Sequence, residues 1–238
     1  MIDLFYSSSP NVFKVMIALE ELALDHRIVF VDLSQGAQHD PEKLGGAISG
    51  KVPVIKDHAP SDEGAPLTVF ESGAILQYLA EKTGRLLPAA PRERLLAMQW
   101  LFWQMGGLGP VGGQFWHFKS FAQRLEPDTD FTYPRRRYTR MLSALWGVME
   151  RQLTTHEYLA GEYSIADIAC FPWIRYLGPD LTDAEFPALA RWHAAIAERP
   201  AVERAYAARD AVKTDYGLNE RGGIAYPWHG LAKNLIVA

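Results

Sequence analysis

Residues Gly50 to Ile55 read GKVPVI, a short apolar segment with a proline near its start. Proline cannot donate a hydrogen bond to a neighbouring strand, so this pattern is typical of the beginning of a strand. A cis bond between Val52 and Pro53 would also turn the Val52 backbone outward, where it can pair with an extended peptide. We therefore predict a strand whose entrance binds a peptide-like ligand.

Strand and helix patterns alternate on both sides of this segment, up to Gly84. The expected strands are residues 2–6, 27–33, 51–55 and 67–70, and the expected helices are residues 10–22 and 72–84. Apolar residues of the first helix fall near one face, and Gly84 is suited to end the second. This order predicts an α/β domain.

The second half of the chain shows only helix patterns. The segment RLLPAAPRE, with two prolines, is typical of a linker and places the domain boundary near residues 87–92. We therefore predict an α/β domain at residues 1–86, an all-helical domain at residues 93–212 and an extended C-terminal tail at residues 213–238.

The composition excludes several classes of protein. Lys plus Arg number 24 against 28 for Asp plus Glu, a net charge of −4, which argues against a basic surface for nucleic acid. No segment reaches the roughly 18 apolar residues of a membrane span. A single cysteine, Cys170, excludes an intrachain disulfide and a Cys-rich metal site. We expect a soluble, cytoplasmic protein with no metal.

Two apparent motifs carry little weight. The run from Gly107 to Gly112 matches the dinucleotide pattern G-x-G-x-x-G, but it follows a helix rather than a strand and contains Pro110. We interpret it as a break between helices. The three arginines of residues 135–137 are, by themselves, typical of a solvated helix face.

A serine cluster, SSSPN at residues 7–11, precedes the first helix. Ser9 followed by Pro10 fits an N-cap with proline in the first turn. A hydrolase nucleophile is a weak alternative, because no Gly-x-Ser-x-Gly elbow surrounds these serines. A third interpretation is an anion site, since a helix N-terminus stabilises negative charge and a cap hydroxyl can donate to it.

Glu71 and Ser72 stand at the start of the next predicted helix. Ser72 alone fits an N-cap, but the pair also offers a hydroxyl and helix N–H groups to a ligand carboxylate, and Glu71 to a ligand amine. A ligand with a thiol, a peptide bond and an α-amino acid end would satisfy all three positions.

Over essentially its whole length the chain resembles the glutathione transferases, with VPVI and ESGAIL as the most specific motifs. SPN resembles the TPN of their nu class, which includes bacterial disulfide-bond reductases, and MQWLFWQMGGLGP echoes another string of that class. The resemblance implies a thioredoxin-like N-terminal domain with a four-stranded mixed sheet and helices on both of its faces, an all-α second domain and glutathione as co-substrate. In GEYSIADIAC, we expect Ser164 and Asp167 to form a capping box, with Tyr163 and Ile168 as its hydrophobic staple.

The resemblance also assigns roles to individual residues. It implies that Ser9 and Asn11 contact the glutathione sulfur and that Arg137 reaches glutathione across a homodimer interface. The other implied glutathione ligands are Gln38 at the glycyl end, Lys51, Val52 and Pro53 at the backbone, and Glu71 and Ser72 at the γ-glutamyl end. The expected second-substrate pocket contains Phe115, Trp116 and Phe118.

The function implied is glutathione-dependent reduction of disulfides, alongside transferase or peroxidase activity, with the thiol supplied by glutathione and not by Cys170. The nearest alternative is a glutathione lyase or transferase that acts on aromatic ethers or halides. A further alternative is a non-catalytic interaction module, against which the complete set of SPN, VPV and ES motifs argues.

Overall fold

The computed structural model describes residues 1–178 and 185–216. The chain forms two compact units. The first consists of Met1–Thr83 and the segment that begins at Pro200, and the second consists of Gly84–Arg199.

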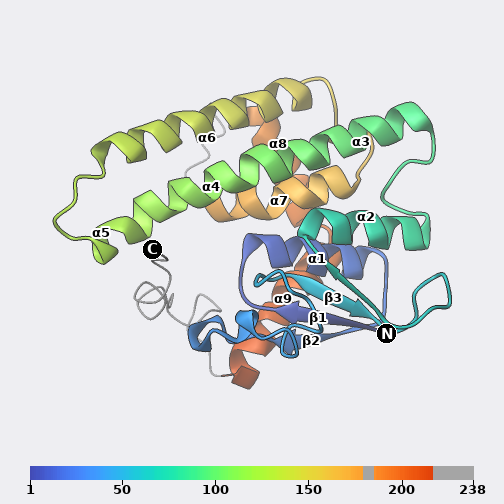
Figure 1. Cartoon of the computed structure of the whole chain (residues 1–238). Coiled ribbons are helices and arrows are strands. Elements are labelled where there is room, and N and C mark those ends of the chain that lie inside the picture. Colours follow the sequence, from blue (N-terminus) through green and yellow to red (C-terminus); the bar gives the residue numbers. More distant parts are fainter. Residues whose placement is uncertain (179–184, 217–238) are drawn as a thin grey trace. The chain divides into compact units, whose positions relative to one another are not determined.

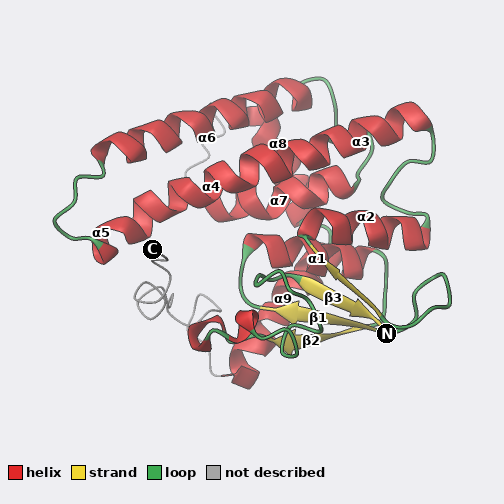
Figure 2. Cartoon of the chain, in the orientation of Figure 1, coloured by secondary structure: helices red, strands yellow, loops and turns green. Residues whose placement is uncertain are grey.

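The first unit is built on a mixed four-stranded sheet, as predicted. Its strands are β1 (Ile2–Tyr6), β2 (His26–Phe30), β3 (Val54–Asp57) and β4 (Leu67–Phe70), and they lie in the order β2-β1-β3-β4. β1 pairs in parallel with β2, while the β1–β3 and β3–β4 pairs are antiparallel. Figure 2 shows the strands in yellow beneath two helices of the same unit.

Both faces of the sheet are covered. Helices α1 (Pro10–Glu21) and α2 (Ser72–Thr83) pack against each other on one side of the sheet (Figure 1). On the other face, the opposed residues Phe5 and Val54 form a cluster with Val31, Leu44 and Ala47. That face is covered by an irregular segment with the short 3-10 helices η1 (Leu33–Gln35) and η2 (Ala37–His39), and not by an α-helix.

The second unit is helical, in agreement with the sequence patterns. Its elements are α3 (Pro91–Trp103), η3 (Gln104–Leu108), α4 (Gly109–Trp116), η4 (His117–Phe121), α5 (Ala122–Leu125), α6 (Thr132–Leu153), α7 (Ile165–Leu177) and α8 (Pro187–Ala197). The predicted capping box is confirmed: the Ser164 hydroxyl accepts from the α7 backbone, and Asp167 accepts from the Ser164 N–H.

The glycine-rich run at residues 107–112 is not the break that we expected. The backbone stays helical through η3, a π-helical turn, into α4. Pro110 has no N–H for the regular ladder, and the wider turn before it accommodates this missing donor. Gly112 serves packing instead, because a Cβ there would lie 2.5 Å from Leu177 Cδ1 and 2.8 Å from Trp173 Cε3.

The last described helix, α9 (Pro200–Tyr216), packs against α1 of the first unit. The Tyr206 ring stacks on Phe13 with centroids 4.3 Å apart, and Arg204 Nε donates to Glu20 Oε2 at 2.6 Å. The sequence patterns predict a helical domain that extends to residue 212, whereas the segment from Pro200 belongs to the first unit. Helical periodicity alone does not reveal which surface a helix covers. The tail expected from residue 213 begins within α9, and residues 217–238 lie outside the described residues.

Candidate functional site

Ser9 is the N-cap of α1, as its sequence context predicts. Its backbone is extended, and its Oγ accepts a hydrogen bond from the Val12 N–H at 3.3 Å, with Pro10 in the first turn. A hydroxyl that accepts through one lone pair still has its own proton to donate. The positive end of the helix also favours an anion at this place. Ser9 and Asn11 are both half-buried at this helix N-terminus.

Tyr6, at the end of β1, precedes the serine cluster and is fully buried. Burial raises the pKa of its phenol to about 12. The phenol therefore stays protonated at neutral pH and cannot act there as a base.

The Val52–Pro53 bond is cis, as predicted, and β3 begins directly after it. Pro53 is buried, Val52 is half-buried and Lys51 is exposed. The structure brings the Gln38 segment to the same place, since a Cβ at Gly50 would lie 4.0 Å from the Gln38 carbonyl oxygen. The Gln38 backbone therefore lies close to Gly50, the residue before Lys51.

Glu71 has a backbone φ of 70°, in the left-handed region that side chains other than glycine rarely adopt. Its carbonyl accepts from the Ile75 N–H at 2.9 Å, so it sits directly at the N-terminus of α2. Its side chain is exposed, whereas Ser72 beside it is buried. Strained backbone of this kind is concentrated at functional sites in proteins.

Lys14 is the residue that the sequence interpretation missed. It lies in α1 with only 1% of its surface exposed, and its Nζ donates to Ser72 Oγ at 3.3 Å. The N-terminus of α2 carries partial positive charge, and Lys14 donates to the hydroxyl that stands there. A signal was available: Lys14 is the one charged residue within the otherwise apolar run Val12–Leu19.

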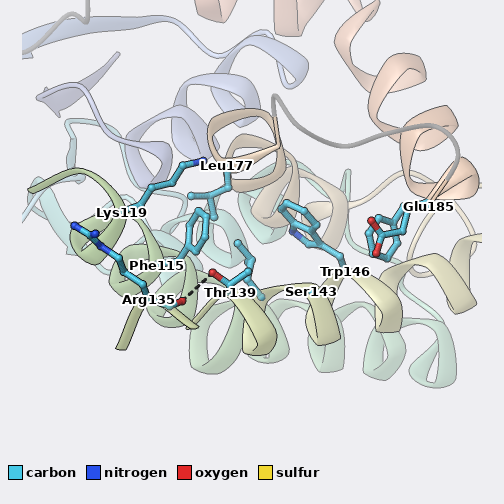
Figure 3. Close-up of a pocket in the computed structure, with 10 residues that line it drawn as sticks. Phe115, Lys119, Arg135, Thr139, Ser143, Trp146, Leu177 and Glu185 are labelled. Carbon is cyan, nitrogen blue, oxygen red and sulfur yellow. Dashed lines mark hydrogen bonds between the residues drawn. The ribbon is translucent and has the colours of Figure 1, made fainter. Parts of the chain in front are cut away.

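The three residues expected to form the second-substrate pocket each have different neighbours in the structure. Phe115 lines a cavity of about 650 Å³ in the helical unit (Figure 3). Trp116 packs against Tyr176, with ring centroids 4.7 Å apart, and Phe118 stacks on Tyr138 at 5.5 Å. Arg137 is exposed on α6 of the same unit.

Cys170 is fully buried in α7, which fits the expectation that it does not supply the reacting thiol. Within residues 1–178 and 185–216, no group of three or more His, Cys, Asp or Glu side chains is arranged to hold a metal ion. No described helix is long and apolar enough to cross a membrane.

Two family models and several known proteins match the chain. The family model of the glutathione S-transferase N-terminal domain matches residues 8–82, and that of the C-terminal domain matches residues 107–200. The chain is 46% identical over 207 residues to the disulfide-bond oxidoreductase YfcG of Escherichia coli K12, covering 86% of this chain and 94% of that protein. It is 34% identical over 235 residues to the disulfide-bond oxidoreductase YghU of the same organism, covering 92% of this chain and 78% of that protein.

Solved structures are similar as well. A glutathione transferase family member from Pseudomonas fluorescens Pf-5, described with two glutathione bound, superposes with a TM-score of 0.78 at 40% identity, covering 86% of this chain and 91% of that one. A glutathione transferase from Pseudomonas putida, described with one glutathione disulfide bound per subunit, also has a TM-score of 0.78 and 40% identity, covering 86% and 90% of the two chains.

Proposed function

Because the chain belongs to the glutathione S-transferase family, we propose that it is a glutathione-dependent enzyme that reduces disulfides. The two Escherichia coli relatives are named for disulfide-bond oxidoreductase activity, and the Pseudomonas structures hold two glutathiones or a glutathione disulfide. We extend both properties, disulfide reduction and glutathione binding, to this chain. Its single buried cysteine and its use of glutathione suit the reducing cytoplasm.

The proposed reaction consumes two molecules of glutathione. The thiolate of the first attacks one sulfur of the substrate disulfide, forms a mixed disulfide and releases one substrate thiol. The thiolate of the second attacks the glutathione sulfur of the mixed disulfide, forms glutathione disulfide and releases the other substrate thiol. Two protons from the glutathione thiols end on the two product thiols, so the protein neither gains nor loses electrons.

The observation that carries this proposal is the arrangement at the N-terminus of α1. Ser9 caps the helix through its oxygen and keeps a proton to donate. Hydrogen bonds to a charged acceptor are stronger than those between neutral groups, so this donor favours glutathione as its thiolate. The enzyme then lowers the thiol pKa without a base of its own.

The start of α2 suits the γ-glutamyl end of glutathione. Its carboxylate would accept from the Ser72 hydroxyl and the first N–H groups of α2, and its ammonium would pair with Glu71. Lys14, whose Nζ lies 3.3 Å from Ser72 Oγ, acts as a positioning residue that orients the hydroxyl and adds positive charge below it.

Lys14→Met should raise the KM for glutathione about tenfold with little change in kcat, because hydrogen bonds to charged groups contribute roughly 1.5–3 kcal/mol and part of this is lost. Lys14→Arg should recover part of the affinity, since it keeps the charge. Steady-state kinetics with glutathione and with cysteinylglycine, which lacks the γ-glutamyl residue, measure the effect. Equal loss with both thiols would show that Lys14 supports the fold and not the γ-glutamyl site.

The proposed reaction is tested with a variant that lacks the single cysteine, Cys170. Reduction of bis(2-hydroxyethyl) disulfide is measured for wild type and Cys170→Ala, each with glutathione or dithiothreitol as donor, and circular dichroism confirms that the mutant is folded. We expect activity with glutathione in both proteins and little with dithiothreitol, which lacks the glutamyl and glycyl ends. Loss of activity in a folded Cys170→Ala protein would contradict the borrowed-thiol mechanism. Faster turnover of a β-aryl ether than of the disulfide would favour the lyase alternative.

We also propose that the enzyme is a homodimer in which Arg137 of one protomer contacts the glutathione of its partner. The exposed Arg137 guanidinium can bind a carboxylate through paired N–H groups. Arg137→Ala should raise the KM for glutathione about fivefold or more without changing thermal stability. The exposed neighbour Arg136, changed to alanine, is the matched control. A protein that sediments as a monomer with full activity would rule out this arrangement.

A further inference from the structure

Two neighbouring side chains at the end of η2, Gln38 and His39, hydrogen-bond to each other. The Gln38 Nε2 lies 3.2 Å from the His39 Nε2. An amide nitrogen can only donate a hydrogen bond, so the imidazole Nε2 must accept it. The ring is therefore in its neutral form, with its proton on Nδ1, and it holds an N–H group of the Gln38 amide.

The His39 ring is packed between two glycines. A Cβ at Gly36 would lie 3.8 Å from His39 Cδ2, and a Cβ at Gly50 would lie 3.5 Å from His39 Nδ1. Both glycines have left-handed backbones, with φ of 70° and 63°, a conformation that glycine adopts readily. The ring thus contacts the segment that leads to the cis bond after Val52, although His39 as a residue stays exposed to solvent.

The Gln38 amide is only partly satisfied in this position. Among the described residues, no donor pairs with its Oε1, which is shielded from solvent. A buried acceptor without a donor is unfavourable, because it has lost its hydrogen bonds to water and gained none in the protein. A ligand that draws the Gln38 side chain outward would relieve this cost.

Protonation of His39 would remove the acceptor that holds Gln38. A histidine cation has an N–H donor at each ring nitrogen, and histidine commonly changes charge between about pH 5 and 8. The amide could rotate so that Oε1 accepts from the cation, but its NH2 group would then occupy the place where Oε1 finds no partner. Because that rotation buries two unpaired donors, we expect the amide to be released instead.

The charged groups near His39 are engaged elsewhere or exposed. Asp40 lies 3.7 Å from Lys43 Nζ and also accepts from the Glu42 N–H at 3.0 Å. Asp32, at the start of η1, accepts from the Ser34 N–H at 2.8 Å. Lys51, which follows Gly50, is exposed. Within the part of the chain that the structure describes, none of these groups forms an ion pair with His39.

We propose that His39 couples the binding of glutathione to the uptake of a proton. Neutral His39 competes with the ligand for the Gln38 N–H group. Protonated His39 releases that group to the glycyl carboxylate and adds a positive charge nearby. His39 is therefore a positioning residue that acts through Gln38, and it favours a ligand that ends in a carboxylate over one that ends in an amide. This coupling rests on the proposed function, in which Gln38 binds the glycyl end of glutathione.

The experiment uses two ligands whose sulfur is blocked, so that ionisation of the thiol does not contribute. These are S-methylglutathione and its analogue with a glycinamide end, each titrated into the full-length protein by calorimetry. From about pH 8 to about pH 5.5, the Kd of S-methylglutathione should fall about 3–10-fold, and that of the amide should change less than about twofold. Titration in two buffers of different ionisation enthalpy counts the protons that are taken up, and only the acid should take up a proton.

His39→Gln can still donate and accept hydrogen bonds but cannot be protonated, so its Kd for S-methylglutathione should be the same at both pH values, without proton uptake. The matched control is His156→Gln, at an exposed position after α6, which should keep the wild-type profile. A His39→Gln protein with the wild-type profile overturns the proposal, as does an equal response of the acid and the amide to pH. If S-methylglutathione binds wild type equally well at both pH values, only the coupling is wrong. If it binds at neither pH, the proposed function is wrong as well.

Discussion

Asp167→Ala is expected to lower the free energy of unfolding by about 3–5 kcal/mol, which is a large part of the stability of an ordinary domain. Asp167 is fully buried at the start of α7. Its Oδ1 accepts from the Leu159 N–H at 2.9 Å and from Trp192 Nε1 at 2.8 Å. Its Oδ2 accepts from the Ser164 N–H at 3.1 Å and from the Ser164 hydroxyl at 3.4 Å. Alanine would leave these buried donors without their acceptor.

Equilibrium denaturation in urea measures the change. The matched control is Asp130→Ala, which removes an exposed carboxylate that accepts from the Thr132 N–H at 2.8 Å before α6. Loss of an exposed cap of this kind should cost about 1 kcal/mol or less. Similar losses in the two variants would mean that burial of the Asp167 network adds nothing to its contribution.

The contribution of Asp167 to stability is also expected to depend on pH. Burial raises the pKa of the Asp167 carboxyl to about 6, although its hydrogen-bond donors oppose the shift. The folded state therefore holds this proton more tightly than the unfolded state, whose carboxyl titrates near pH 4. The contribution of this group is complete below about pH 4 and is lost as the pH rises through about 6. Asp167→Asn cannot ionise, so its stability should fall less than that of wild type over this interval.

The local features of the chain could be predicted from the sequence. The Ser9 cap and the Ser164–Asp167 capping box each depend on residues within a few positions of one another, as does the presence of a strand near Pro53, although β3 begins at Val54 and not at the expected residue 51. Turn, cap and strand preferences act over that range, so the pattern of residue types is sufficient to predict such features.

The features that were not predicted depend on residues far apart in the chain. Lys14 meets Ser72 across 58 positions, and Arg204 meets Glu20 across 184. Helical periodicity places Lys14 and α9 on helices but does not say what they contact. The π-helical turn before Pro110 was missed for a related reason: a proline predicts a missing hydrogen bond, while packing decides whether the chain breaks or the turn widens.

Ser9→Ala is expected to slow glutathione-dependent disulfide reduction about 10–100-fold at neutral pH, because a hydrogen bond to a charged group is worth roughly 1.5–3 kcal/mol. The lost donor should also raise the pKa of the bound thiol, so the profile of kcat/KM against pH should move to higher pH. Asn11 offers a second donor, so activity should not be abolished. The measurement is the pH profile of each variant, together with the thiolate absorbance of bound glutathione.

Alanine at this position also removes the helix cap, which the Ser9 side chain forms with the Val12 N–H. Ser9→Gly separates the two roles, because glycine costs only a few tenths of a kcal/mol at an N-cap and has no hydroxyl. Ser9→Thr keeps both the cap and the donor. If thiolate stabilisation is the role of Ser9, the glycine variant should be as slow as the alanine variant and the threonine variant should be close to wild type. Complete loss of activity in Ser9→Ala with an unchanged thiol pKa would instead indicate covalent chemistry at Ser9, and a glycine variant as fast as wild type would reduce the residue to a helix cap.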